Sequence, residues 1–165
     1  NRFDYVGMKY LAVATIQAFI IIGTLFLYYF VDILAMGRGW AWILDTFPMF
    51  LTTVFCALLL VVTYTSIGLA LSSVSRGKFF PGIALLALLL GTKTLAAIVE
   101  GLFDRSILYL ISPYDSVAHV GQALIGTNVV YDHPWIWSLA SVIAINAIAL
   151  YVLSVRVSSM EVTRE

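Results

Sequence analysis

The hydrophobic positions of this chain fall into four long blocks separated by polar stretches. The blocks cover residues 11–30, 50–71, 79–103 and 135–155. About 20 apolar residues in a helix, rising about 1.5 Å each, span the roughly 30 Å hydrocarbon core of a bilayer. The pattern therefore predicts an all-α integral membrane protein. We expect a single transmembrane domain over residues 1–165, with four transmembrane helices and short interfacial helices.

The polar stretches near the first two blocks predict interfacial and loop segments. Residues 1–10 mix charged and aromatic side chains, as in a short interfacial helix that leads into a span. Residues 31–48 contain two glycines, two tryptophans and a proline, which predicts a wet loop with the tryptophans as interfacial anchors.

Residues 104–133 predict an extracytoplasmic region that is interfacial or re-entrant. Within it, Ser112 followed by Pro113 and Asp115 is a typical helix start. Apolar residues then recur with helical spacing up to Gly126, which favours a short amphipathic helix.

The composition is typical of a membrane protein and gives no support for a nucleic-acid partner. Hydrophobic residues make up 62% of the 165 residues, charged residues 11%, and the mean hydropathy is +1.00. The net charge is zero, so no electrostatic argument favours nucleic acid as a partner. The single cysteine, Cys56, excludes an intrachain disulfide.

The distribution of basic residues predicts the orientation of the chain. With four spans, both ends lie on one side, and that side collects six basic residues against two on the other. The six are Arg2, Lys9, Arg76, Lys78, Arg156 and Arg164, and the two are Arg38 and Arg105. We therefore expect both termini in the cytoplasm.

The third block carries two charges, Lys93 and Glu100, well inside it. Seven residues are about two helical turns, so the two side chains share one stripe. An ionisable group near the bilayer centre costs at least about 2.5–3.5 kcal/mol, so this stripe should not face lipid. One interpretation is a substrate path, with Lys93 attracting an anionic group. The other is a structural ion pair, formed between the two residues or with a neighbouring helix.

The second block ends in small residues that predict close helix packing: Ser66, Gly68, Ala70 and Ser72. The hydroxyls of Thr63, Thr65 and Ser66 could instead line a path, although such hydroxyls usually bond back to their own helix. Gln17, the one strongly polar residue inside the first block, is expected to hydrogen-bond between helices rather than to contact a substrate.

Catalytic motifs are missing from the chain. Gly77-Lys78 lacks the upstream glycine and the following hydroxyl of a phosphate loop, and there is no nucleophile elbow or HExxH. The histidines His119 and His133 are predicted to be solvated loop side chains, too few for a metal site. We therefore expect no catalytic residues, no metal and no cofactor on this chain.

The order of features resembles the C-terminal two thirds of the membrane subunit of type-2 ATP-binding-cassette (ABC) exporters, a permease family that includes drug, polysaccharide and gliding-motility transporters. The motifs that carry the resemblance are Gly7-Met8-Lys9, Ile-Gly-Leu-Ala-Leu-Ser-Ser at 67–73, Ile-Ser-Pro-Tyr-Asp at 111–115, and the tail pairs Arg156-Val157 and Glu161-Val162. Charges at the positions of Lys93 and Glu100 are a departure from the family pattern.

The resemblance implies a non-enzymatic export permease in a bacterial-type plasma membrane, with these four spans as the last four of six. It implies a separate ABC ATPase subunit that holds ATP and Mg, and a second permease, identical or homologous. Coupling to the ATPase would fall on Arg2, Phe3, Asp4, Tyr5 and Lys9. The alternative is a non-transporting accessory membrane subunit of a larger assembly, and an intramembrane enzyme ranks third for want of a catalytic constellation.

Overall fold

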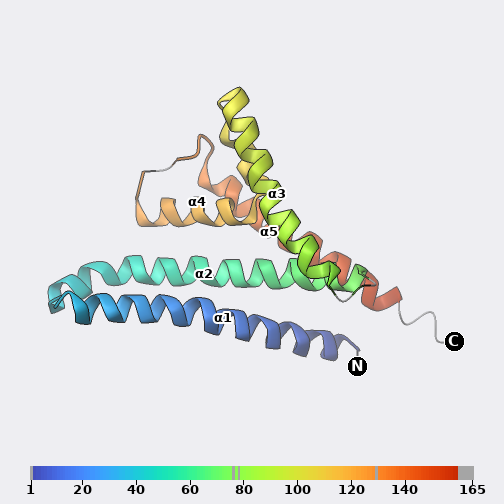
Figure 1. Cartoon of the computed structure of the whole chain (residues 1–165), viewed down its shortest axis with the longest axis horizontal. Coiled ribbons are helices and arrows are strands. Elements are labelled where there is room, and N and C mark those ends of the chain that lie inside the picture. Colours follow the sequence, from blue (N-terminus) through green and yellow to red (C-terminus); the bar gives the residue numbers. More distant parts are fainter. Residues whose placement is uncertain (1, 76, 78, 129, 160–165) are drawn as a thin grey trace.

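The fold is built from helices joined by short connections (Figure 1). The computed structural model describes residues 2–75, 77, 79–128 and 130–159, which contain helices and turns but no strand. The elements in chain order are α1 (Arg2–Ala35), α2 (Trp40–Val74), α3 (Phe80–Phe103), the 3-10 helix η1 (Ser106–Ile111), α4 (Pro113–Ile125) and α5 (Trp135–Ser159). The prediction of an all-α chain is confirmed.

Four of these helices, α1, α2, α3 and α5, are long and apolar enough to cross a membrane. They correspond to the four hydrophobic blocks of the sequence. The helices α1 and α2 have 34 and 35 residues. At about 1.5 Å per residue each is roughly 50 Å long, well beyond the roughly 30 Å of a hydrocarbon core.

The extra length of α1 and α2 bears on two predictions. The helix predicted within residues 1–10 is present, and from Arg2 onward it is continuous with the first long helix. Residues 31–48 were predicted as a loop, and that prediction is wrong because only four residues separate α1 from α2. The reversal takes place at Gly37, whose φ of 59° lies in the left-handed region that glycine adopts without strain.

An aromatic cluster holds this hairpin closed. The Tyr29 ring stacks on Trp42 and Phe50, with centroids 5.8 and 4.4 Å apart, and its hydroxyl lies 3.0 Å from Thr46 Oγ1. The Arg38 guanidinium lies 5.1 Å from the centroid of the Trp42 ring. The residues predicted as loop are therefore ordered by ring packing around Tyr29, which composition alone did not indicate.

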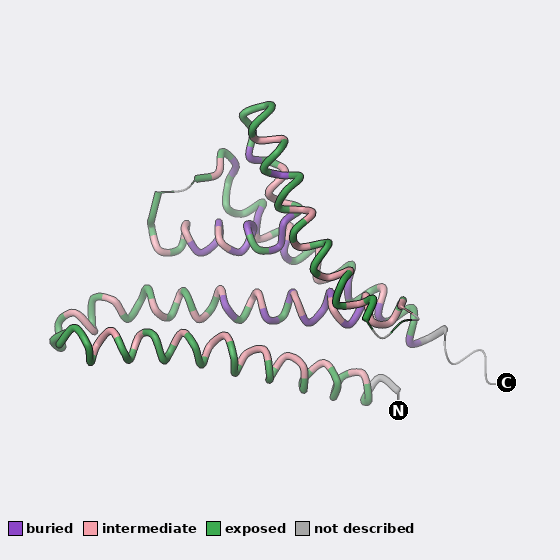
Figure 2. The backbone as a smooth tube through the Cα atoms, viewed as in Figure 1, coloured by how far each residue is buried: buried purple, intermediate pink, exposed green. Residues whose placement is uncertain are grey.

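The helix α2 lies at the centre of the molecule, with contacts to α1, α3, α4 and α5. Figure 2 shows its buried residues gathered in its C-terminal half, whereas α1 and α3 are mostly exposed. Three hydroxyl-bearing residues of α2, Thr63, Thr65 and Ser66, are at most 1% exposed. The core of the fold thus contains a polar stripe of α2 beside its buried apolar residues, such as Val61 and Ile67.

Each hydroxyl of this stripe has a partner. Thr65 Oγ1 donates to Gln17 Oε1 of α1 at 2.9 Å, so the predicted interhelical role of Gln17 is confirmed. Asn146 Nδ2 of α5 donates to Thr63 Oγ1 at 2.9 Å, and the Tyr10 hydroxyl lies 3.2 Å from Ser66 Oγ. The Thr63 and Ser66 hydroxyls also donate to backbone carbonyls one turn back in α2, as predicted.

The four small residues predicted to mediate helix packing face different neighbours. Ser66 faces α1, and Ala70 packs in a buried cluster with Ala149 of α5. A Cβ atom at Gly68 would lie 4.0 Å from Leu85 of α3. Ser72 is half-buried and lines a cavity. The small residues of α2 therefore face three helices, α1, α3 and α5, rather than one.

The short helix α4 begins and ends where the sequence predicts. Ser112 is its N-cap and Pro113 its first residue, with Asp115 N donating to Ser112 Oγ at 3.5 Å. Gly126 closes it with a φ of 76°. The helix packs closely on α2 at Gly121, where a Cβ atom would lie 3.1 Å from Cys56 Sγ.

Replacement of Ser66 by leucine should destabilise the fold. Ser66 is fully buried between α2 and Tyr10, so the larger side chain overpacks the contact, and we expect a loss of about 1–3 kcal/mol. Gly68→Ala is the control, because its Cβ has room beside Leu85. Thermal unfolding in mild detergent measures both variants. Equal stability of Ser66→Leu and the unmodified chain would contradict close packing at this position.

Candidate functional site

The two charges of α3 each have a tyrosine partner from the segment that follows this helix. Lys93 Nζ lies 4.8 Å from the centroid of the Tyr114 ring, a cation–π contact. The Tyr109 hydroxyl donates to Glu100 Oε2 at 2.6 Å. This hydrogen bond to a carboxylate raises the pKa of Tyr109 to about 12. Among the described residues neither charge is in an ion pair.

Local geometry explains why the tyrosines reach back to α3. Asp104 ends the helix in the left-handed conformation, with a φ of 52°, and the chain turns directly into η1. Ser116 of α4 and Ser141 of α5 both donate to the Leu110 carbonyl at the end of η1. Because η1 is fixed to two helices in this way, Tyr109 is held against Glu100.

Tyr109 also begins a chain of aromatic and acidic contacts toward α4. Its ring packs edge-on against Tyr131, with centroids 5.4 Å apart. The Tyr131 hydroxyl donates to Asp115 Oδ1 at 3.3 Å, and Ser112 Oγ donates to Oδ2 of the same carboxylate at 2.5 Å. Burial and the nearby Asp115 charge raise the pKa of Tyr131. Both tyrosines therefore remain neutral donors to carboxylates at physiological pH.

Two histidine side chains lie within hydrogen-bonding distance of one serine, next to this chain of contacts. His119 Nδ1 of α4 lies 2.7 Å from Ser138 Oγ of α5, and His133 Nε2 lies 3.0 Å from the same oxygen. The two imidazole rings are edge to face, with centroids 4.8 Å apart, and the His119 ring is 4.7 Å from that of Tyr131. His133 Nδ1 is buried and has no hydrogen-bond partner.

The prediction that both histidines are solvated loop residues is wrong. His119 is 1% exposed and His133 is 8% exposed. Desolvation lowers the pKa of both imidazoles below their ordinary value of 6.5, and for His119 the neighbouring His133 adds to the effect. The pair is therefore neutral at physiological pH.

The sequence does contain a signal for this site. Ser112, Asp115, Ser116 and His119 recur at i, i+3, i+4 and i+7, so they form a polar stripe along α4. The apolar stripe of the same helix predicts a surface helix with its polar side in water. In the structure α4 lies against α2 and α5, and the polar stripe is buried together with Val117, Val120 and Gly121 of the apolar one.

The cluster is enclosed, which limits its chemistry. Ser138 is 1% exposed, so no substrate carbon reaches its hydroxyl in this conformation. A cavity of about 310 Å³ adjoins His133 and is also lined by the charged residues Asp104, Arg105 and Asp132. Within the described residues no group of three or more His, Cys, Asp and Glu side chains is arranged to hold a metal ion. The arrangement suits proton exchange and hydrogen bonding.

The residues predicted to couple to an ATPase lie at the opposite end of the molecule. Asp4, Tyr5 and Lys9 are exposed on the first turns of α1, and the side chains of Arg2 and Phe3 lie outside the described part of the chain. Arg76, Lys78 and Arg164, which were counted for orientation, lie outside it too.

Comparison of the chain with protein-family models, with curated proteins and with solved structures finds no match in any of the three.

Acidification should destabilise the fold through the buried histidines. Because the folded pKa of His119 and His133 is lowered, the unfolded chain binds more protons between that pKa and 6.5. Stability is therefore complete above about pH 6.5 and falls as the pH drops toward the folded pKa. Thermal unfolding between pH 8 and pH 5 measures this loss. In a His119→Gln, His133→Gln variant the fall should be smaller, and an unchanged slope would contradict the assignment.

The contact between Tyr109 and Glu100 should be energetically coupled. Tyr109→Phe leaves the carboxylate without its donor, so we expect a loss of about 1–3 kcal/mol in the free energy of unfolding. In a Glu100→Leu background the same substitution should cost little, because no carboxylate remains. The double-mutant cycle measures the difference. Equal losses in both backgrounds would show that the Tyr109 hydroxyl contributes to stability independently of Glu100, since the substitution leaves the ring that packs on Tyr131 in place.

Proposed function

We propose that the chain is an integral membrane protein and the permease subunit of an ABC-type export system. In this proposal α1, α2, α3 and α5 cross the membrane, a separate ATPase chain hydrolyses ATP, and a second permease completes the translocation route. The helix lengths and their apolar composition support the membrane setting.

The observation that carries the transport proposal is the position of Lys93. It lies near the middle of α3, in an otherwise apolar helix, and its side chain is exposed. The Tyr114 ring lies against the Lys93 ammonium. This ring contact leaves the three N–H donors of the ammonium without hydrogen-bond acceptors. In a bilayer such a group requires water, a ligand or a neighbouring chain. A hydrated route along α3 meets that requirement and offers a cation to an anionic substrate.

The arrangement of the chain ends supports coupling to an ATPase. The first turns of α1, the C-terminal end of α2 and the last turns of α5 lie together at one end of the molecule (Figure 1). The basic residues predict that this end is cytoplasmic. In the proposed mechanism the exposed start of α1 receives the motion of the ATPase and α2 carries it to α3, α4 and α5.

The accessory-subunit alternative draws on the exposure of α1 and α3. Large apolar side chains such as Phe19 and Leu102 are largely exposed on them. Such faces suit docking to other membrane helices as well as contact with lipid. In that case Lys93 would bind an acidic residue of a partner rather than a substrate.

Isolation of the chain from its native membrane in mild detergent distinguishes the two functions. The exporter proposal predicts a stoichiometric partner with a phosphate loop and ATPase activity in the complex. An Arg2→Ala, Phe3→Ala, Asp4→Ala variant should lose this partner, whereas Arg38→Ala, at the opposite end, should keep it. A stable complex that contains no nucleotide-binding chain would favour the accessory subunit.

Replacement of Lys93 by methionine should abolish export while the complex still assembles. The loss of the cation removes the attraction for an anionic substrate, so we expect at least a tenfold fall in exported material; Lys93→Arg should retain export. Mass spectrometry of the material outside cells that carry each variant provides the measurement. Export at the level of the unmodified chain by an assembled Lys93→Met complex would rule out this role.

A further inference from the structure

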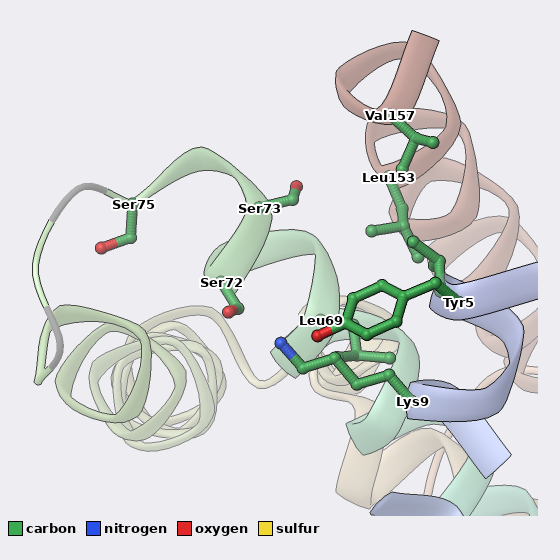
Figure 3. Close-up of a pocket in the computed structure, with 9 residues that line it drawn as sticks. Tyr5, Lys9, Leu69, Ser72, Ser73, Ser75, Leu153 and Val157 are labelled. Atoms are coloured by element: carbon green, nitrogen blue, oxygen red, sulfur yellow. The ribbon is translucent and has the colours of Figure 1, made fainter. Parts of the chain in front are cut away.

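A cavity of about 440 Å³ lies where α1, α2 and α5 meet (Figure 3). Its lining is Tyr5, Val6, Lys9, Leu69, Ser72, Ser73, Ser75, Leu153 and Val157. This volume is in the usual range of small-molecule sites. The cavity combines a cation and several hydroxyls with an apolar wall, so its chemistry differs from one side to the other.

The polar side has donors without partners. In Figure 3 the Lys9 ammonium and the Tyr5 hydroxyl project together into the space beside Ser72. Among the described residues no hydrogen bond or ion pair is formed by Lys9 Nζ, Tyr5 Oη or Ser72 Oγ. In contrast, Ser73 Oγ donates to the Ala70 carbonyl at 2.7 Å and Ser75 Oγ to the Gly77 carbonyl at 3.1 Å. One ammonium and two hydroxyls are thus available to a ligand.

The apolar side is part of the protein core. Leu69, Leu153 and Val157 form a buried cluster, and Val6 packs against it. A small hydrated anion gains nothing from such a wall, whereas an amphiphile places its hydrocarbon there. The cavity therefore favours a ligand that carries an anionic group on one side and apolar carbon on the other.

We propose that this cavity binds the phosphate headgroup of an anionic phospholipid from the cytoplasmic leaflet. The single net charge of an anionic phospholipid matches Lys9, the one cation among the described residues that line the cavity, and the phosphate oxygens accept from Tyr5 and Ser72. The glycerol and the first acyl carbons lie against Leu69 and Leu153. The inference rests on the membrane setting of the proposed function, but not on the ATPase or on transport.

The depth of the cavity agrees with this ligand. Tyr5, Lys9, Ser72 and Val157 lie within a few residues of the ends of the predicted spans 11–30, 50–71 and 135–155. This is the level of headgroups rather than of acyl tails. The basic residues predict the cytoplasmic side, whose leaflet is rich in anionic lipids, and pockets of this kind between helices bind lipid headgroups.

Lipid retention by the purified full-length chain tests the proposal. Native mass spectrometry after incubation with phosphatidylglycerol or phosphatidylcholine should show at least fivefold greater retention of phosphatidylglycerol. Lys9→Met and, separately, a Tyr5→Phe, Ser72→Ala variant should lose this preference. Arg38→Met is the matched control, because it removes a cation at the opposite end, and it should keep the preference. Phosphatidylglycerol should raise the unfolding temperature of the unmodified chain but not of Lys9→Met.

Three results would overturn the proposal. Equal retention of the two lipids would exclude recognition of an anionic headgroup. An unchanged preference in Lys9→Met, with a folded chain by circular dichroism, would place the lipid elsewhere. Competition by millimolar inorganic phosphate that abolishes lipid retention would identify soluble phosphate as the ligand.

Failure of this inference is separable from failure of the proposed function. If the chain inserts into vesicles and resists alkaline extraction but shows no lipid preference, the membrane setting stands and the lipid site is wrong. If alkaline treatment releases the chain from vesicles, the membrane setting itself fails. The ATPase partner is tested by the separate isolation experiment, which leaves Tyr5 and Lys9 intact.

Discussion

The structure depends on the hydroxyl stripe of α2. Thr63, Thr65 and Ser66 are buried in an apolar helix. The Thr65 hydroxyl donates to Gln17 of α1, and a buried hydroxyl without a partner costs several kcal/mol when no water is present. Thr63 and Ser66 donate within α2 and bind Asn146 of α5 and Tyr10 of α1 as well. Each partner comes from a different position on α1 or α5, so the stripe fixes the rotation and height of both helices against α2. Apolar contacts alone would allow these helices to slide, because one leucine surface resembles another. The hydrogen bonds select one register.

Hydropathy predicts the helices of this chain well and their ends poorly. The four blocks correspond to α1, α2, α3 and α5 because continuous apolar sequence of this length has few other stable forms. Residues 40–48 were assigned to a loop because their tryptophans and proline are typical of interfaces. In the structure they extend α2, and the ring stack around Tyr29 decides this. Such a contact joins residues of two helices, so local composition does not predict it.

The candidate site was predictable only in part. Lys93 and Glu100 stand out because charges are rare in apolar helices, but their tyrosine partners depend on the sharp reversal at Asp104 and on η1. The burial of the histidines depends on the packing of α4 against two helices, which is a tertiary property. In the sequence it is indicated only by the polar stripe with helical spacing from Ser112 to His119. A short amphipathic helix with two coherent faces can bury both when one of them contains a hydrogen-bonded network.

The placement of Ser138 between two imidazoles has a consequence for where protons reside. A hydroxyl has one hydrogen to donate, so at most one ring can accept from it, and in a fully bonded arrangement the other ring must donate an N–H. If His133 donates from Nε2, its unpartnered Nδ1 is a bare lone pair; the reverse arrangement would leave a buried N–H without an acceptor. The first arrangement is the cheaper one, and it assigns the Nε2–H tautomer to His119 as well. The two rings therefore share one tautomeric state, and a change of tautomer in either histidine requires the other to change with it.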